Sequence, residues 1–220
     1  MIALVIAPHP DDEVLGVGGT IARLASEGHE IHVAIVTKGE PELFAESLIE
    51  QGRDEAARCR ELLGVKETHF MDFPAARLDA VQHHQLNLAI DRLVSTVCPQ
   101  LVFLPFGHDM HKDHRLVFES ALVALRPMTA RSVVDILCYE TLSETNWNMP
   151  GGTDSFTPNV FVDISEFLES KLRAARAYAS QMRAFPHERS IEAISYLARL
   201  RGANVGKNAA EAFVQVRRII

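Results

Sequence analysis

Strand-like and helix-like runs alternate regularly up to residue 142, and this alternation constrains the fold more than any other feature of the sequence. Strands are predicted where apolar runs are rich in β-branched residues, at 3–7, 29–39, 68–73, 100–106 and 132–142. Helices are predicted where apolar residues recur with helical spacing, at 14–28, 48–65, 80–99 and 112–125. Strands that alternate with helices pack as parallel βαβ units. The predicted fold class is therefore α/β: a Rossmann-like three-layer sandwich, with a mostly parallel sheet and helices on both faces.

The pattern changes after residue 142. Residues 143–159 are rich in Gly, Pro, Asn and Thr and predict a long loop, which we expect to act as a lid or specificity element. A strand is predicted at 160–165, helices at 165–183 and 188–201, and a last strand at 211–219. The sequence shows no repeat and no linker, and 220 residues fit one α/β domain. Residues 1–220 are thus predicted to form a single domain.

Charge and composition exclude several classes of protein. The net charge of −7 and the pI near 5.8 disfavour nucleic acid as a partner, because phosphate binding requires a basic surface. No apolar run approaches the length that crosses a bilayer, and MIALVIAPHP lacks the basic region of a signal peptide. Cys59, Cys98 and Cys138 match neither a CxxC metal pattern nor a disulfide framework. These features predict a cytoplasmic protein without a membrane span.

The stretch APHPDDE, residues 7–13, follows the first predicted strand, at the edge of the sheet where open α/β folds bind ligands. A dinucleotide site would need a third glycine at the position of Ile21, and the three acids of this turn would repel a pyrophosphate. Carboxylates packed closely together require a cation instead. His9 beside them makes a ligand set for zinc or a similar ion, on a turn stiffened by Pro10. The alternative is a helix cap, which leaves His9 and Pro10 unexplained.

A second polar cluster, PFGHDMHKDHR at residues 105–115, follows the fourth predicted strand. If the first and fourth strands are neighbours, both clusters lie at the same edge of the sheet. His9, Asp12 and His114 would then form a set of two histidines and one carboxylate, which leaves a coordination position for water on a catalytic zinc ion. The alternative for this second cluster is a solvated helix start capped by Asp113.

The two motifs together resemble those of the LmbE/PIG-L-type zinc-dependent N-acetylglucosamine deacetylases. The resemblance extends through RDEAARCRELLG, DFPAARLD, YETLSETNW and FTPNVFVDIS, and through residues 185–218. It implies a Zn²⁺ ion, with Fe²⁺ or another divalent metal as alternatives, bound by His9, Asp12 and His114. It also implies a homo-oligomer, as in several members of that family.

The resemblance further implies three roles in amide hydrolysis. Asp11 would be the general base that takes a proton from the attacking water. His111 would stabilise the oxyanion, and Asp113 would orient His111 and favour its charged form. Two positions depart from the usual family pattern. Lys112 occupies a position where proline is common, and the motif that often reads HPRS has Glu188 in place of its proline.

Candidate substrate contacts are less specific than the two motifs. Arg53 and Arg189 can hold phosphate, carboxylate or sugar hydroxyl groups, with surface solvation as the alternative. Tyr139 and Trp147 can stack on a sugar ring, with packing as the alternative. His187 is a candidate for the site of its own chain or of a neighbouring subunit.

The predicted function is removal of an acetyl group from an N-acetylated amino sugar conjugate, a small-molecule substrate. A metal-dependent phosphoesterase is one alternative, although two-metal enzymes of that class need more bridging carboxylates than the two motifs supply. A non-catalytic, metal-dependent sugar-binding module is another, and it would leave Asp11 and His111 without a role.

Overall fold

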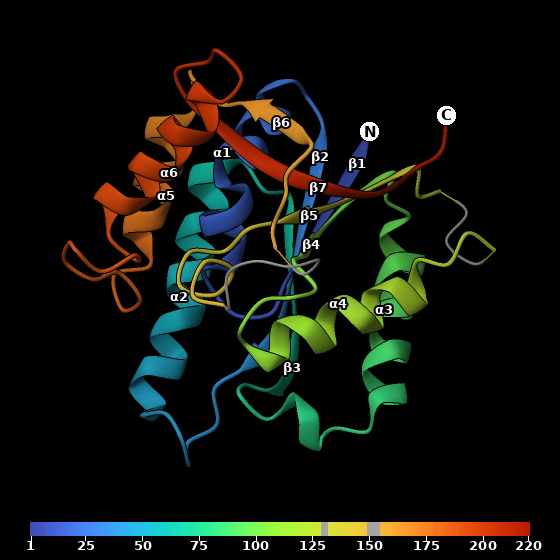
Figure 1. The fold of residues 1–220 in the computed structure, drawn as a ribbon. Helices are drawn as coiled ribbons and strands as arrows, with labels where there is room; N and C mark the ends of the chain where they lie inside the picture. Colours follow the sequence, from blue (N-terminus) through green and yellow to red (C-terminus); the bar gives the residue numbers. More distant parts are fainter. Residues whose placement is uncertain (129–131, 149–154) are drawn as a thin grey trace.

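The computed structural model describes residues 1–128, 132–148 and 155–220, and within them one seven-stranded sheet carries helices on both faces (Figure 1). The strands are β1 (Ile2–Ala7), β2 (Glu30–Lys38), β3 (Glu67–Pro74), β4 (Leu101–Pro105), β5 (Asp135–Tyr139), β6 (Val160–Asp163) and β7 (Ala210–Arg218). The helices are α1 (Asp12–Ser26), α2 (Glu46–Leu63), α3 (His83–Val97), α4 (Lys112–Ala124), α5 (Leu168–Ala177) and α6 (Ile191–Ala203), with a short 3₁₀ helix at Leu78–Ala80.

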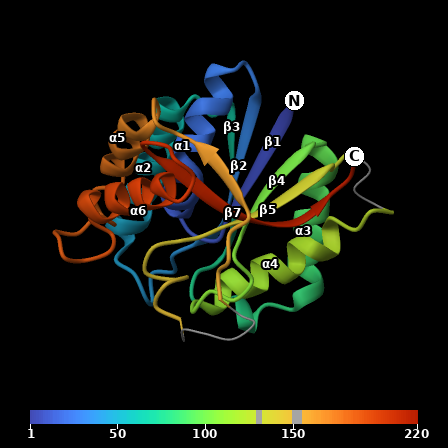
Figure 2. The ribbon, with the colours of Figure 1, turned by 45° about the horizontal axis from the view of Figure 1, so that its top comes forward.

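The strand order is β3-β2-β1-β4-β5-β7-β6. The first five strands along the chain are parallel to one another, and β7 runs antiparallel to both β5 and β6. Helices α1, α2, α5 and α6 cover one face, and α3 and α4 cover the other (Figure 2). This arrangement confirms the predicted α/β sandwich with a mostly parallel sheet.

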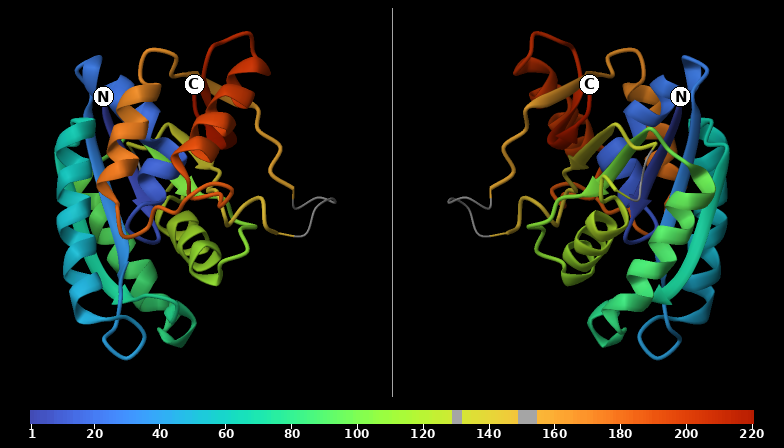
Figure 3. Two further views of the ribbon diagram at one scale, coloured as in Figure 1. Left: turned by 90° about the vertical axis from the view of Figure 1, so that its left-hand side faces the viewer. Right: turned by 90° about the vertical axis from the view of Figure 1, so that its right-hand side faces the viewer.

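The β1 strand, IALVIA, is apolar throughout because helices cover both faces of the sheet. Alternate side chains point to opposite faces. Val5 therefore packs into the core below α1 and α5, whereas Leu4 and Ile6 pack into the core below α3 and α4. Both chain termini lie at the end of the sheet where β1 begins (Figures 1 and 3), so the carboxyl ends of the parallel strands lie at the opposite end.

No helix within the described ranges is both long enough and apolar enough to cross a membrane. Residues 149–154 of the predicted lid loop at 143–159 lie outside the described residues.

Tyr139 ends β5 below helix α1 and is fully buried. Its hydroxyl donates a hydrogen bond to the carbonyl oxygen of Ile6 at 2.9 Å, and its ring packs against Gly16. The prediction that Tyr139 contacts the substrate is therefore wrong. Its side chain points from the sheet into the helix layer, and the absence of a side chain at Gly16 makes the room for the ring.

Replacing Gly16 by alanine is expected to destabilise the protein, because the added Cβ would lie 2.2 Å from Cδ2 of Tyr139. Overpacking of this kind lowers the free energy of unfolding by about 1–3 kcal/mol. Gly52→Ala in α2 is the matched control, since nothing lies within 4 Å of the added Cβ. There the higher helix propensity of alanine should raise stability by up to about 1 kcal/mol. Urea unfolding measures both changes, and equal effects at the two sites would contradict the packing argument.

Candidate active site

The turns that follow β1 and β4 meet, because these two strands are parallel neighbours in the sheet. Asp12 Oδ2 lies 3.3 Å from His9 Nδ1 and 3.2 Å from His114 Nε2. The rings of His9 and His114 lie 5.3 Å apart between centroids. The structure thus brings together the three side chains that the sequence suggested as metal ligands, and all three can reach one ion.

The first turn holds Asp11 in an unusual backbone conformation, with φ 110° and ψ −24°. This left-handed conformation is costly for a residue with a side chain and is often found at functional sites. Surrounding hydrogen bonds maintain it: the Asp11 carbonyl accepts from the N–H groups of Val14 and Leu15, at 3.1 and 2.9 Å. The His9 N–H also donates to Asp12 Oδ2 at 2.8 Å. As a result Asp12 faces the two histidines, whereas Asp11 lines the adjacent cavity.

Several buried polar atoms at this site are without a hydrogen-bond partner among the described residues. They include Asp11 Oδ1, Asp12 Oδ1 and His114 Nε2, the last of which has only its ion-pair contact with Asp12. A buried acceptor without a partner is costly, and a cation bound by Asp12 and His114 would satisfy the atoms of these two residues. Two imidazoles and one carboxylate form a donor set suited to zinc and similar divalent ions. The residues present therefore fit the metal that the sequence suggested.

Acidic neighbours raise the pKa of both candidate ligand histidines, His9 and His114. Burial alone would lower the pKa of His9, but hydrogen bonds to Asp113 and Asp12 outweigh it and raise the pKa to about 9. For His114 burial is likewise outweighed, mainly by the charge of Asp12, and the pKa rises to about 10. Protons thus provide the positive charge in the metal-free site. Because a metal ion must displace them, metal affinity should rise as pH increases.

Asp109 is a buried carboxylate beside the candidate ligands, and the sequence assigned no role to it. Its Oδ2 lies 2.8 Å from Nδ1 of His114, and its Oδ1 accepts a hydrogen bond from Thr145 Oγ1 at 2.6 Å. A carboxylate on the far nitrogen of a ligand histidine fixes the ring and its tautomer. The only signal in the sequence was the position of Asp109 inside the second cluster, which does not identify its partner.

The predicted pairing of Asp113 with the His111 side chain is wrong. The Asp113 carboxylate lies 3.1 Å from His9 Nε2 and accepts from the Ala76 N–H at 2.7 Å. The backbone N–H of Asp113 instead donates to Nδ1 of His111 at 3.1 Å. These contacts arise because His111 caps α4, which directs its ring toward its own backbone. Asp113 therefore orients His9.

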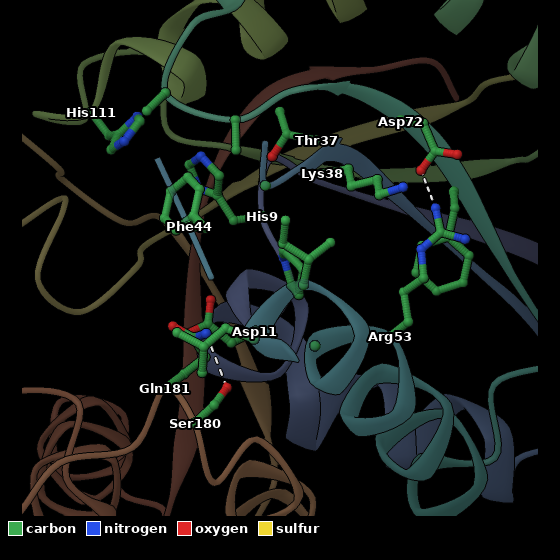
Figure 4. Close-up of a pocket in the computed structure, with 18 of the residues that line it drawn as sticks. His9, Asp11, Thr37, Lys38, Phe44, Arg53, Asp72, His111, Ser180 and Gln181 are labelled. Carbon is green, nitrogen blue, oxygen red and sulfur yellow. Dashed lines mark hydrogen bonds and ion pairs between the residues drawn. The ribbon is translucent and has the colours of Figure 1, made fainter. Parts of the chain in front are cut away.

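His111 is consequently a neutral hydrogen-bond donor rather than a cation. Burial, followed by the nearby charge of His9, lowers its pKa to about 4. Because Nδ1 accepts a hydrogen bond, the proton of the neutral ring resides on Nε2. His111 lines the same cavity as Asp11 (Figure 4).

Arg189 reaches Asp11 from the segment before α6. Its guanidinium lies 3.0 Å from Asp11 Oδ2 and also donates to Ser143 Oγ at 2.9 Å. Burial raises the pKa of Asp11 to about 8, and the charge of Arg189 opposes this rise. Glu188, which departs from the family pattern, accepts a hydrogen bond from the Ser143 N–H at 2.7 Å and so fastens the loop after β5.

The cavity in front of these residues has a volume of about 360 Å³. His9, Asp11 and His111 lie at one end, and Arg53, Lys38 and Asp72 lie toward the other (Figure 4). The walls between them are largely apolar, formed in part by Phe44, Leu48, Ile49 and Phe70. Of the predicted substrate contacts, Arg53 and Arg189 line this cavity.

His187 and Trp147 are outside the described lining of the cavity and pack against each other, with ring centroids 5.8 Å apart. The sequence left two roles open for Trp147, stacking on a sugar or packing against protein, and its contact with His187 is of the packing kind. The predicted approach of His187 to the site of a neighbouring subunit stays a prediction.

Comparison with known proteins identifies the family. The family description "PIG-L: GlcNAc-PI de-N-acetylase" matches residues 4–125, which include both motifs. The chain belongs to the PIG-L family. A curated relative, the diacetylchitobiose deacetylase of Thermococcus kodakarensis, is 32% identical over 84% of this chain and 70% of its own length. The resemblance seen in the sequence is thus confirmed.

Solved structures support the PIG-L assignment at the level of the fold. The conserved protein TT1542 from Thermus thermophilus superposes with a TM-score of 0.81 at 28% identity, over 99% of this chain and 96% of that one. The 4-carboxy-2-hydroxymuconate hydratase GalB from Pseudomonas putida has a TM-score of 0.77 at 22% identity, over 100% and 97% of the two chains. Since proteins of different reactions share this fold, the reaction has to be argued from the site residues.

Asp109→Asn is expected to weaken metal binding by this PIG-L chain about 10–100-fold, the usual cost of losing a carboxylate behind a ligand histidine. An amide can no longer attract the proton on His114 Nδ1 as strongly, so the ring orientation loosens. Titration of the metal-free protein with zinc in the presence of a competing chelator measures the effect. Thr145→Val removes the donor to Asp109 Oδ1 and the acceptor of the Thr141 N–H but leaves the Asp109 carboxylate in place, so it should cause a smaller loss. Equal affinities of D109N and wild type would contradict this role.

Arg189→Met is expected to raise the pKa of Asp11, because the arginine charge favours the carboxylate. A base acts only when deprotonated, so the acidic limb of the pH profile of kcat/KM should move to higher pH. Activity near neutral pH should fall by about 10–10²-fold and recover partly as pH increases. Arg189→Lys, which retains a positive charge, should shift the profile less. A uniform loss at every pH would indicate that Arg189 only binds substrate.

Proposed function

We propose that this chain is a metal-dependent hydrolase that removes the acetyl group from an N-acetylated amino sugar conjugate of the N-acetylglucosamine type. The family description and the Thermococcus kodakarensis relative both name removal of an acetyl group from such sugars. The observation that carries the proposal is the position of Asp11. It lies on the cavity wall directly beside the three candidate ligands but contributes no ligand atom to them.

The proposed ligands are His9, Asp12 and His114, and the proposed ion is Zn²⁺, with Fe²⁺ or another divalent ion as alternatives. A divalent ion there would supply a Lewis acid that polarises the acetamide carbonyl and lowers the pKa of water. Asp113 and Asp109 support this set by holding His9 and His114, respectively. This support preorganises the ligands and restricts the directions in which their lone pairs can point.

Asp11 is the proposed general base. It takes the proton of the attacking water, and Arg189 favours the carboxylate form that this step needs. His111 is proposed to donate its Nε2–H to the oxygen that becomes negative as the carbonyl carbon turns tetrahedral. A neutral donor suits this role, because its hydrogen bond strengthens as charge develops on the oxygen. Either Asp11 or His111 then protonates the departing amine.

The part of the conjugate beyond the amino sugar is proposed to lie toward Arg53 and Lys38. Arg53 forms an ion pair with Asp72 and stacks on Phe70, 4.7 Å from the ring centroid, so its guanidinium is held in place at the cavity wall. An ordered guanidinium is suited to sugar hydroxyl groups or to an anionic group. Residues 1–220 are proposed to act as one domain, since one sheet includes strands from both halves of the chain. A homo-oligomer and a cytoplasmic location stay predictions.

The test is acetate release by the purified, metal-loaded protein from a panel of N-acetylglucosamine conjugates that carry neutral or anionic aglycones. Saturable release of acetate, with the free amine as the second product, is the expected result. Phosphate release from phosphorylated sugars without acetate would favour a phosphoesterase. Saturable sugar binding without turnover would favour a binding module. Either of these results would reject the deacetylase proposal.

A further inference from the structure

Two histidines and a glutamate face one another on the neighbouring strands β2 and β3, away from the candidate active site. His32 Nδ1 lies 2.9 Å from His69 Nε2, and Glu67 Oε2 lies 3.8 Å from each of these two nitrogens. The three atoms are close enough together to share one ion. Thr37 lies five residues after His32 on β2, and its hydroxyl donates a hydrogen bond to the carbonyl oxygen of Pro8 in the active-site turn. Five residues of a strand span about 16 Å. The cluster is therefore separate from the site described above.

The register of the sheet creates this cluster. In the parallel β2–β3 pair, His32 stands opposite Glu67, and Ala34 stands opposite His69. Glu67 and His69 are two residues apart on one strand, so their side chains emerge on the same face. That face is the one covered by α3 and α4, as the packing of Ala34 shows. A shift of the register by one residue would separate the three side chains.

Glu30 orients His32 in the way that carboxylates orient metal-binding histidines. Its Oε1 lies 2.9 Å from His32 Nε2, so Nε2 carries the ring proton and Nδ1 keeps a free lone pair. The hydrogen bond from His32 and the contact with Lys66, at 2.6 Å, lower the pKa of Glu30, which therefore remains a carboxylate. Nδ1 of His32 is thus presented toward His69 and Glu67 as a preorganised donor atom.

We propose that His32, His69 and Glu67 form a second metal site, selective for zinc and similar divalent transition ions, which links strand β3 to β2. Two imidazoles and one carboxylate are the donors these ions prefer. Zinc–nitrogen bonds of about 2.0–2.1 Å in tetrahedral geometry place two nitrogens about 3.3 Å apart. His32 Nδ1 and His69 Nε2 are now 2.9 Å apart, and rotation of the two rings, whose centroids lie 5.2 Å apart, would bring the nitrogens to that separation.

In the metal-free protein the proton of His69 Nε2 occupies the space between the two rings, since Nδ1 of His32 can only accept. When the ion binds Nε2, this proton would leave Nε2, and the neutral His69 ring would carry its single proton on Nδ1. Burial lowers the pKa of His69, although the charge of Glu67 opposes this effect.

The location of the cluster indicates a stabilising role. Strand β3 is an edge strand of the sheet and pairs only with β2 among the described residues. Glu67 is more than half exposed, which gives an ion access from solvent, whereas His32 is buried. An ion bound there would fasten the edge strand to its neighbour and reduce its availability for pairing with other chains.

The test is a zinc titration of the full-length, metal-free protein with a competing chromophoric chelator. Wild type should bind about two equivalents, His69→Gln about one, His114→Ala about one, and the double variant close to none. His84→Gln, which removes an exposed histidine of α3 outside the cluster, is the matched control and should bind as wild type does. The His69→Gln variant should keep its deacetylase activity once loaded with metal, because it is remote from the candidate active site.

Two further variants keep the proposal testable if His69→Gln folds poorly. Glu67→Gln replaces an exposed ligand and should remove the second equivalent, while Glu30→Gln should weaken it about 10–100-fold without removing a ligand. In the His114→Ala background, zinc should raise the Tm, and Glu67→Gln should abolish that rise. Two results would reduce the cluster to a hydrogen-bonded pair and overturn the proposal. One is saturation of wild type at one equivalent that His114→Ala abolishes, and the other is an unchanged second equivalent in both His69→Gln and Glu67→Gln. These outcomes do not depend on whether acetate is released.

Discussion

Asp11→Asn is expected to lower kcat/KM for acetate release by about 10²–10⁴-fold, the range associated with loss of a general base. Asparagine preserves the size of the side chain and tolerates the left-handed backbone conformation of this position, which alanine tolerates less well. Because Asp11 contributes no atom to the candidate ligand set, the metal content should remain that of wild type. Steady-state kinetics and metal analysis on the same preparation check both expectations.

Glu13→Gln is the matched control for Asp11→Asn, since Glu13 is another buried acid of the same turn. Its Oε1 accepts a hydrogen bond from the Tyr178 hydroxyl at 2.5 Å, its Oε2 accepts one from the backbone N–H of Asp11 at 3.2 Å, and the side chain lies away from the described lining of the cavity. Its loss of turnover should therefore stay below about tenfold, less than that of a missing base. Near-normal turnover of fully metal-loaded D11N would reject Asp11 as the base.

His114→Ala is expected to abolish both metal binding at the active site and turnover. The change removes one of three ligands and leaves Asp12 with a single imidazole partner. Loss of a residue that hydrogen-bonds to a ligand histidine costs about 10–100-fold in metal affinity. Loss of the ligand itself should therefore lower metal affinity by more than about 10²-fold. Metal analysis after dialysis, together with acetate release at saturating zinc, measures the two effects. Wild-type turnover in the His114→Ala variant would contradict the proposed function.

His111→Ala provides the contrast to His114→Ala. Both residues belong to the same helix start, but the backbone of Asp113 holds His111, which is not assigned as a ligand. We expect H111A to keep its active-site metal and to lose about 10²–10³-fold in kcat, as for removal of an oxyanion donor. Thermal unfolding of both variants shows whether a loss of activity reflects a loss of folded protein. Adding zinc, iron(II) or cobalt(II) to chelator-treated wild type then compares the candidate ions.

Much of the fold followed from short stretches of sequence. The alternation of apolar strands and amphipathic helices specified the parallel core of the sheet, and the positions of Gly64 and Pro99 marked helix ends to within a few residues. The two polar clusters were visible because each follows an apolar strand directly. Their meeting in space depended on the adjacency of β1 and β4, which the sequence allowed but did not require.

The side-chain partners inside the site were much harder to predict. Asp113 binds His9 rather than the neighbouring His111, because the start of α4 turns the carboxylate toward the backbone at Ala76. Asp109 supports His114, and Tyr139 is buried below α1 rather than exposed to substrate. Each of these contacts depends on the direction of a side chain relative to a distant segment, which local spacing does not encode.

The order of residues along the chain was sufficient for the layered α/β architecture, for the two candidate metal-binding motifs and for the family, since periodicity and motif spacing are local properties. The tertiary structure alone decided that Arg189 faces Asp11 from 178 positions away and that His32 meets His69 across two strands. The physical reason is that such contacts are set by strand order, register and helix packing. These arise from burying the whole core at once, and no short stretch of sequence contains them.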